Sequence, residues 1–257
     1  MNRTINIRDL TIGYAAKHRQ IVVAEHLDGD ILGGQLTCLL GPNGVGKSTL
    51  LKTLSSFSQP ISGTVKIGDT DLAHMNPGQM ARTVGVVLTA KPEVQNLTVE
   101  EIVAMGRTPY TGFWGTLRAE DRKIVDDALL TVGIDNLRHR LAGQLSDGES
   151  QRMMIAKVLA QQTPVVVLDE PTAFLDFPSK VELLRLLRRV AHETGKIVFL
   201  STHDVEMALR LSDTIWLLQR GRLSIGTPQE LSMDGSLSAF LDRAGMCYDP
   251  ASQTVRI

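Results

Sequence analysis

The sequence predicts an α/β fold in which a largely parallel sheet is covered by helices on both faces. Short apolar runs without alternation recur at LTCLL (36–40), VVVL (165–168) and IVFL (197–200). Such runs are typical of strands that are buried on both faces. Between them lie helical patterns such as AEDRKIVDDALLTV (119–132), in which apolar residues recur at helical spacing. The alternation of strands and helices indicates α/β architecture.

Local signals mark where several helices begin. Thr98 with Glu101, and Ser179 with Glu182, match the capping-box pattern, in which side-chain oxygens satisfy free amides of the first turn. Asp204 follows the apolar run at 197–200 and is expected to cap a further helix. The sequence therefore predicts three helix starts at these positions.

The distribution of these patterns predicts one domain with an inserted lobe. The stretch from about Asp71 to Gln144 is more helical than its flanks, and we interpret it as part of a helical lobe of about residues 90–160 inserted into the sheet domain. The whole chain, 1–257, is expected to form this single domain. Its tail, from SIGTPQEL onward, predicts a terminal helix and strand packed on the rest.

Composition argues against several classes of partner and of site. Lys and Arg total 27 against 28 acidic residues, so no overall positive field favours nucleic acid or anionic lipid. Cys38 lies inside LTCLL, far in sequence from Cys247, which indicates a buried apolar residue instead of a disulfide framework or a zinc site. The first residues lack a signal-peptide pattern, and no run approaches the roughly 20 apolar residues of a membrane helix. We therefore expect a cytosolic protein that meets a membrane only through a partner.

The sharpest chemical signal is GPNGVGKST at 41–49, between an apolar strand and the helical segment LLKTL. It fits the pattern GxxxxGK[ST], in which glycines let backbone amides surround phosphates at a helix start. Lysine then reaches the outer phosphates, and the serine hydroxyl binds magnesium. The alternative is a glycine-rich turn with a solvated lysine, which the strand and helix context disfavours. The expected phosphate-binding residues are Gly41, Pro42, Asn43, Gly44, Val45, Gly46, Lys47, Ser48 and Thr49.

Acidic residues follow a second apolar strand, and a histidine follows a third. In PVVVLDEPT, Asp169 is placed to hold magnesium together with Ser48, and Glu170 to activate an attacking water. His203 lies just past IVFL, at the strand end where ligands bind in open α/β sheets, and could hydrogen-bond the γ-phosphate and orient the water. The alternatives are solvated acids at the end of a strand and a structural histidine. Next to a phosphate-binding loop, we favour a catalytic pair of Glu170 and His203.

The order of motifs resembles that of the ATP-binding subunit of an ABC transporter: GPNGVGKST, LSDGESQ, VVVLDE, AFLD and STHD. The resemblance covers nearly the whole chain, and the ordered set is far more specific than any single motif. It implies a P-loop NTPase fold, namely an ABC ATPase cassette with a RecA-like sheet core, an antiparallel β subdomain and a helical subdomain. It also implies ATP and Mg²⁺ as ligands, and hydrolysis of ATP coupled to translocation.

The same resemblance implies partners and a location. Two copies form a homodimer that acts with integral membrane permease subunits and, indirectly, with a substrate-binding protein. The dimer would be a peripheral protein on the cytoplasmic side of the cell membrane, with no nucleic acid partner. The resemblance further implies that Tyr14 stacks on adenine and that Asp176 of AFLD contacts the opposite subunit. A plain surface tyrosine and a solvated loop acid are the alternatives for these two residues.

In this family the segment LSDGESQ (145–151) closes over the nucleotide bound by the other subunit. Ser146 would donate its hydroxyl and Gly148 its amide to the γ-phosphate, at the start of a helix expected from about Glu149. Asp147 departs from the family pattern, which has glycine there, and an acid near a phosphate should repel it. We predict a working signature with weakened closure of the dimer.

A second departure concerns the loop that senses the membrane partner. Alignment of RTVGVVLT (82–89) with the family's strand puts Thr89 where a glutamine normally reaches the metal. Gln95 lies six residues further on and could substitute only if the loop is rearranged. This departure puts the coupling step in doubt and leaves ATP binding unaffected.

The segment 96–129 resembles the helical lobe of importers for iron chelates, haem and cobalamin, in which a GR-x-P-aromatic stretch precedes an acidic helix start. In those importers this face receives the permease, whereas the alternative here is a generic loop whose aromatic residues, Tyr110, Phe113 and Trp114, pack on the lobe. The rival functions are a soluble, non-transport ABC ATPase, an ATP-binding regulatory module without turnover, and an ABC ATPase serving another cargo. The resemblance favours import of a metal chelate.

Overall fold

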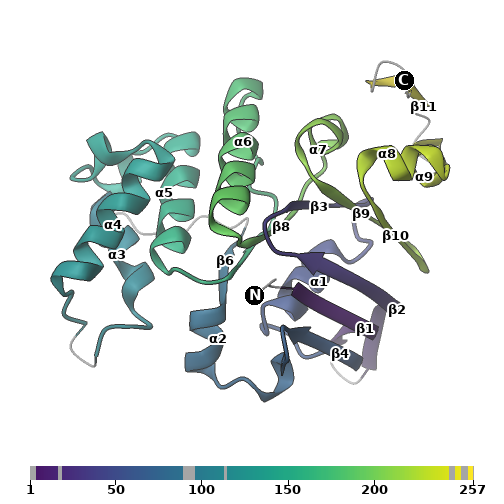
Figure 1. The fold of residues 1–257 in the computed structure, drawn as a ribbon, viewed down its shortest axis with the longest axis horizontal. Helices are drawn as coiled ribbons and strands as arrows, with labels where there is room; N and C mark the ends of the chain where they lie inside the picture. The colour runs from purple at the N-terminus through teal and green to yellow at the C-terminus, as the bar shows by residue number, and fades with distance from the viewer. Residues whose placement is uncertain are drawn as a thin grey trace.

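The computed structural model describes residues 4–16, 19–88, 96–112, 115–242, 247–249 and 254–256. Within these ranges the chain forms a six-stranded sheet, a four-stranded sheet and a short hairpin, with helices around them (Figure 1). The larger sheet has the strand order β10-β9-β3-β8-β7-β6 and is parallel except for β10, which pairs antiparallel with β9. Its strands are β3 (Leu36–Leu40), β6 (Val84–Val87), β7 (Val165–Leu168), β8 (Ile197–Ser201), β9 (Thr214–Gln219) and β10 (Arg222–Gly226).

The smaller sheet is antiparallel, with the order β2-β1-β4-β5. It comprises β1 (Thr4–Ala16), β2 (Arg19–Leu32), β4 (Ser62–Ile67) and β5 (Thr70–Asp71). In Figure 1 it lies together with α1 on one side of the larger sheet, while α3, α4 and α5 form a separate group at one end of the molecule. The helices are α1 (Lys47–Leu54), α2 (Pro77–Thr83), α3 (Val99–Ala104), α4 (Ala119–Val132), α5 (Asp147–Ala160), α6 (Phe177–Thr194), α7 (Val205–Leu211), α8 (Pro228–Met233) and α9 (Ser236–Asp242). Short 3₁₀ turns are η1 (Leu72–His74), η2 (Met105–Arg107), η3 (Asp135–Leu137) and η4 (Ala142–Gln144).

Two hydrophobic cores explain the uninterrupted apolar strands. On β7, Val166 and Leu168 pack into the core beneath α3 to α9, whereas Val165 and Val167 pack into the core shared with α1 and the antiparallel sheet. β3 and β8 divide their side chains in the same way. Because both faces of the central strands are covered, neither face needs polar residues. The predicted α/β fold is therefore confirmed.

Of the three predicted helix starts, those at Thr98 and Asp204 are confirmed and the one at Ser179 is wrong. Thr98 and Glu101 form the expected capping box at the start of α3. Ser179 does not begin a helix, because α6 already starts at Phe177 and the carboxylate of Asp176 accepts a hydrogen bond from the Ser179 amide. A carboxylate cap followed by proline in the first turn is a strong start signal, and it places Ser179 inside the helix.

Two further expectations need correction. Asp204 occupies the cap position of α7 but makes no side-chain cap; its carboxylate accepts instead from Lys180 Nζ at 3.2 Å. The tail contains two helices, α8 and α9, and the hairpin β11 (Cys247–Asp249) with β12 (Thr254–Arg256), more than the one helix and one strand expected.

Cys38 is fully buried as a free thiol, and this burial raises its pKa to about 12. Across the described residues, no helix combines the length and apolar character needed to cross a membrane.

Candidate nucleotide-binding site

The loop between β3 and α1 is built around backbone shapes that favour glycine. Gly44 and Gly46 have φ angles of 76° and 114°, in the left-handed region that side chains rarely adopt. A Cβ at Gly46 would also lie 2.4 Å from Cγ1 of Val23, and one at Gly41 would lie 2.6 Å from the carbonyl oxygen of Leu218. The loop therefore turns tightly into α1, whose cap, Gly46, makes no side-chain hydrogen bond to the first-turn amides. These amides are placed for an anion.

Lys47 is the first residue of α1, and its side chain is buried. Its ammonium donates to the carbonyl oxygens of Gly41 at 2.7 Å and Pro42 at 3.3 Å, and it lies 3.5 Å from Nδ1 of His203. Burial lowers the pKa of Lys47, while the nearby carboxylates of Glu170 and Asp169 act in the opposite direction. The chain thus folds its lysine back over its own loop, between the carbonyl groups and the acidic strand end.

Asp169 and Ser48 meet at one point from two different elements. Asp169 Oδ1 accepts from Ser48 Oγ at 3.3 Å and from Ser201 Oγ at 2.7 Å. Ser201 in turn accepts from the Glu170 amide at 2.9 Å. Ser201 is fully buried at the end of β8, and it fixes both acidic residues from the neighbouring strand. Sequence reasoning missed its role, although it is the first residue of the STHD motif.

Glu170 and His203 also lie together. Glu170 has a φ of 49°, a left-handed conformation that turns its side chain away from the line of β7, and its Oε1 contacts Nε2 of His203. The loop and Glu170 line a pocket of about 330 Å³ that also includes the exposed ring of Tyr14. Val23 is a lining residue that sequence reasoning missed. The predicted residues that line the pocket are Tyr14, Asn43, Gly44, Gly46, Lys47, Ser48, Thr49 and Glu170.

The remaining predicted residues surround this pocket without lining it. Gly41 and Pro42 hold the lysine through their carbonyl groups, whereas Val45 is 5% exposed and packs in the core with the antiparallel sheet. Asp169 contacts the lining residue Ser48, and His203 contacts the lining residue Glu170. The structure therefore brings the predicted residues of the first, third and fifth motifs to one place.

The signature residues lie at the start of α5. The helix begins at Asp147, two residues before the expected start, because Ser146 and Glu149 form a capping box. The Ser146 hydroxyl accepts from the Glu149 amide at 3.3 Å, and the Glu149 carboxylate accepts from the Ser146 amide at 2.7 Å. These bonds from Ser146 hold the pKa of Glu149 below its ordinary value. Ser146 and Asp147 are exposed, and neither Ser146 nor Gly148 belongs to the residues that line the pocket.

Asp176 of AFLD has a local role as the cap of α6. Hydrogen bonds from Ser179 hold the pKa of its carboxylate below the ordinary value. The side chains of Phe174 and Phe177 on either side are 74% and 69% exposed. Thr89 and Gln95, the two candidates for the metal-sensing loop, lie outside the described residues, as do Phe113 and Trp114.

The fold and the site define a P-loop nucleotide-binding protein, and comparisons with known proteins narrow this class. A family model described as ABC transporter matches residues 24–173. The ferric enterobactin transport ATP-binding protein of Escherichia coli (strain K12) is 36% identical over 223 residues, which are 86% of this chain and 81% of that protein. The chain therefore belongs to the ABC transporter family, in which it is an ATP-binding ATPase.

Two further similarities bear on cargo and assembly. A cobalamin import ATP-binding protein of Halobacterium salinarum is 33% identical over 237 residues, which are 91% of this chain and 59% of that protein. Among solved structures, a dimeric bacterial ABC transporter cassette superposes with a TM-score of 0.76 at 26% identity, covering 87% of this chain and 98% of the other.

Proposed function

We propose that this chain is the ATP-hydrolysing subunit of an ABC importer that powers uptake of a metal chelate through a membrane permease. The contact between Glu170 and His203 beside the loop at 41–49 carries the proposal. It puts a carboxylate and an imidazole next to the lysine that would hold the outer phosphates, as an ATPase requires and a passive nucleotide-binding module does not.

ATP binds with its adenine against the ring of Tyr14 and its phosphates in the loop at 41–49. Tyr14 is 52% exposed at the edge of the pocket, so a flat base can cover it. Lys47 donates to the outer phosphates once its ammonium leaves the carbonyl groups of Gly41 and Pro42. Amides at the start of α1 contribute further donors and a positive dipole end.

A magnesium ion fits the oxygen donors of Ser48 and Asp169. These two oxygens lie 3.3 Å apart, and a hydroxyl with one carboxylate is the sparse ligand set that Mg²⁺ accepts when phosphates complete its shell. Bound there, the ion would neutralise charge on the phosphates. Ser201 keeps the Asp169 carboxylate oriented toward that position through its 2.7 Å hydrogen bond.

Hydrolysis needs a water held in line with the terminal phosphate. Glu170 accepts a proton from that water, and His203 holds the Glu170 carboxylate through Nε2 while its Nδ1 faces Lys47. Ser201 fixes the backbone of Glu170 by accepting its amide hydrogen. The arrangement positions the base before any partner arrives.

The second half of each ATP site comes from another copy of the chain. Ser146 and Gly148 at the start of α5 contact the γ-phosphate bound by the opposite subunit, and Asp176 lies beside the same interface. The exposed Ser146 and Asp147 at the start of α5, together with the exposed Phe174 and Phe177, support a surface that is covered in the dimer. The dimer is peripheral, on the cytoplasmic side of the membrane, and works with permease subunits and a substrate-binding protein.

The cargo is an iron siderophore, haem or cobalamin. Similarity to transport proteins for ferric enterobactin and for cobalamin supports this range. Purification of the chain with its membrane partner, followed by ATPase assays in liposomes, tests the assignment. The expected result is turnover stimulated by one of these chelates with its binding protein; stimulation by an unrelated solute alone would contradict it.

Glu170→Gln tests the catalytic step directly. The amide cannot accept the proton, so turnover is expected to fall about 100-fold or more, the scale of general base catalysis. ATP binding is expected to remain, and the dimer to accumulate in the presence of ATP. Glu182→Gln, on an exposed carboxylate that pairs with Arg152, is the control and should keep wild-type turnover. Wild-type hydrolysis by Glu170→Gln would sink the assignment.

A further inference from the structure

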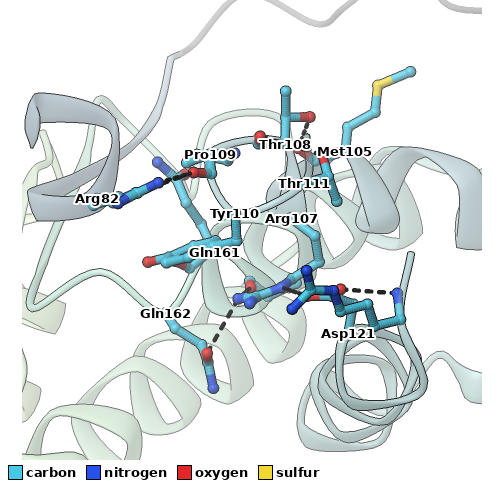
Figure 2. Close-up of polar contacts among 12 residues, drawn as sticks. Arg82, Met105, Arg107, Thr108, Pro109, Tyr110, Thr111, Asp121, Gln161 and Gln162 are labelled. Atoms are coloured by element: carbon cyan, nitrogen blue, oxygen red, sulfur yellow. Dashed lines mark hydrogen bonds and ion pairs between the residues drawn. The ribbon is translucent and has the colours of Figure 1, made fainter. Parts of the chain in front are cut away.

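A polar cluster with a buried ion pair at its centre lies where the helical group meets the larger sheet, away from the proposed nucleotide pocket (Figure 2). We call it the Arg107 cluster; its members are Arg82, Arg107, Tyr110, Asp121, Gln161 and Gln162. Arg107 and Asp121 are 5% and 7% exposed, so this charged pair is held inside the protein. A buried ion pair gives little stability on balance, and its cost calls for another reason for its presence.

Arg107 joins three elements with one guanidinium group. Its Nε donates to Asp121 Oδ1 at 2.9 Å, and its Nη1 donates to the carbonyl oxygen of Ala160 at 2.9 Å and to Gln162 Oε1 at 3.1 Å. Asp121 belongs to the first turn of α4, where it also accepts from the Arg118 amide at 3.0 Å. The Ala160 carbonyl lies in the last turn of α5, and a carbonyl at this position has no partner within its own helix. Arg107 therefore ties η2 to both helices.

Tyr110 extends the cluster toward the sheet. Its ring covers the Arg107 guanidinium at 4.1 Å and faces that of Arg82 at 5.4 Å, and its hydroxyl donates to the Gln161 carbonyl at 2.9 Å. Arg82 donates from Nε and Nη2 to the Pro109 carbonyl, at 3.0 and 2.8 Å. Figure 2 shows Tyr110 lying between the two arginines.

Gln161 connects this group to the strand at the edge of the sheet. Its Nε2 donates to the Ala81 carbonyl at 2.6 Å and lies 3.4 Å from that of Val84, at the junction of α2 and β6. At the other end of β6, the Val87 carbonyl accepts from the Asp169 amide at 2.8 Å. One short strand thus separates the Arg107 cluster from the acidic residues of the nucleotide pocket.

Gly106 explains why η2 can lie this close to α5. A Cβ at Gly106 would lie 2.2 Å from the Lys157 carbonyl oxygen, so only glycine permits the approach. The stretch GRTPY therefore has a physical reason at each of four positions: Gly106 for contact, Arg107 for the buried bonds, Pro109 as an acceptor and Tyr110 as the cover.

We propose that Arg107 and Tyr110 are positioning residues that fix α5 against β6 and thereby align the signature half-site, Ser146 and Gly148, with the chain's own catalytic strand end. This inference rests on the function proposed above. In the proposed dimer, β6 ends beside the residues that bind the chain's own ATP, and α5 begins at the residues that contact the ATP of the opposite subunit. The Arg107 cluster therefore links the two sites.

The length of α5 shows why such a link matters. Its 14 residues form a rod of about 21 Å, so a tilt of about 5° at the clamped end displaces Ser146 by about 2 Å. A misplacement of about 1 Å is enough to reduce catalysis roughly 100-fold in a tightly organised site. Loosening the Arg107 cluster should therefore weaken closure of the dimer, while leaving the loop at 41–49 intact.

The test compares Arg107→Gln with Arg138→Gln in the full chain. Arg138 also forms an ion pair, with Asp126 at 2.7 Å, but this pair lies within the helical group and does not reach β6. In a Glu170→Gln background, sedimentation measures the ATP concentration at which half of the chains dimerise. Fluorescent ATP, with protein diluted below dimerisation, measures binding to the single chain. Turnover and its Hill coefficient are measured without Glu170→Gln.

Arg107→Gln is expected to raise the half-dimerisation concentration and to lower kcat, each about tenfold or more, given the sensitivity of such sites to misplacement. The Hill coefficient is expected to fall toward one, and single-chain binding to stay within about twofold, since the loop at 41–49 is untouched. Arg138→Gln is expected to match its parent. Unchanged dimerisation and kcat in folded Arg107→Gln, or an equal loss of single-chain binding, would overturn the inference.

Tyr110→Phe and Arg82→Gln cover the case in which Arg107→Gln does not fold, because both side chains are partly or largely exposed. Each variant is expected to raise the ATP concentration at which half of the chains dimerise about threefold, which is the scale of one hydrogen bond. Unchanged dimerisation in both would overturn the proposal. A Glu170→Gln parent that never dimerises with ATP would instead refute the proposed function, and the inference with it.

Discussion

The two halves of the ATP-binding surface differ in how far one chain completes them. Around Lys47 and Asp169, groups from the loop after β3, from α1, from the residues that follow β7 and from β8 already bond to one another, so the loop, the proposed magnesium ligands and the proposed base are held together. At the start of α5, Ser146 and Glu149 cap the helix by bonding to each other, Glu149 also pairs with Arg140 at 3.6 Å, and Ser146 and Asp147 are exposed. In the proposed dimer, a half-site of this second kind is preorganised by its helix cap and receives its phosphate from a second chain.

This contrast separates two kinds of variant. Changes on the loop side should impair ATP binding by a single chain, or should impair turnover. Changes at the start of α5 should leave single-chain binding unchanged and impair dimerisation. Each prediction below either breaks this division or sharpens it.

Lys47→Ala should have the largest effect. The variant lacks the charged donor to the outer phosphates. Because each charge-assisted hydrogen bond contributes about 1.5–3 kcal/mol, the ATP affinity of the single chain should fall about 100-fold or more. Isothermal titration calorimetry with diluted protein measures this. Lys52→Ala, in the last turn of the same helix, is the control and should bind normally. An affinity within about fivefold of wild type, less than 1 kcal/mol, would contradict the role of Lys47.

Ser201→Ala should affect turnover more than binding. The variant loses the donor to Asp169 and the acceptor for the Glu170 amide, both inside a fully buried position. Removing such bonds costs about 1–3 kcal/mol, which corresponds to a fall in kcat of roughly five- to 100-fold with a smaller change in KM. Steady-state kinetics at saturating magnesium checks this.

Ser55→Ala provides the matched control for Ser201. Ser55 is also buried, but its hydroxyl bonds only to the Leu51 carbonyl at the end of α1. Its kcat should stay near wild type, even if the protein loses stability. Equal kinetics for Ser201→Ala and Ser55→Ala would show that orientation by Ser201 is unimportant.

Ser146 variants separate the helix cap from the phosphate contact. Ser146→Ala loses both and should lower the free energy of unfolding by about 1 kcal/mol, whereas Ser146→Asp keeps a cap but repels phosphate. Both should impair ATP-driven dimerisation, measured in the Glu170→Gln background, and only Ser146→Ala should lower Tm. Thr227→Ala, which removes an equivalent cap at α8, should lower Tm without affecting dimerisation. Normal dimerisation by Ser146→Asp would place the phosphate contact elsewhere.

How much of this site the sequence predicts depends on how local its contacts are. The loop at 41–49 was predictable because its phosphate-binding groups are contiguous and the flanking strand and helix are short-range features. Ser201 was missed because it acts across parallel strands, on residues 31 and 32 positions away. The helix start at Ser179 was misplaced because Asp176, three residues earlier, is the stronger cap.

The GRTPY stretch shows a different limit. Resemblance to importers implied that the segment 96–129 forms a face that meets the permease, with packing on the lobe as the alternative for its aromatic residues, and it gave no role to Arg107, which the structure buries against Asp121, 14 residues away, and against the end of α5. The acceptors that allow this burial lie in other elements, so only the tertiary fold reveals them. The exposed part of Tyr110, at 38%, remains compatible with a nearby partner.

Asp147→Gly should have the smallest effect, and it tests the departure from the family pattern. At about 6 Å, a carboxylate repels a phosphate charge by roughly 0.7 kcal/mol in a water-like medium and about 3 kcal/mol at an effective dielectric constant of 20. Against this, an acid in the first turn of α5 stabilises the helix by about 0.3–1 kcal/mol. Because Asp147 is exposed, the lower repulsion applies, and it is about as large as the helix effect.

The two effects act on different equilibria: the helix effect acts on folding of the single chain, and the repulsion acts on dimerisation, because it depends on the ATP held by the other subunit. Asp147→Gly should therefore dimerise at an ATP concentration about two- to fivefold lower in the Glu170→Gln background, consistent with a gain of roughly 0.4–1 kcal/mol. Asp147→Asn keeps the side-chain size and avoids the helix penalty of glycine, so it should shift in the same direction if charge is the cause. If both variants half-dimerise at the same ATP concentration as their parent, Asp147 directs its charge away from the phosphate, and the start of α5 tolerates an acid at no cost to closure of the dimer.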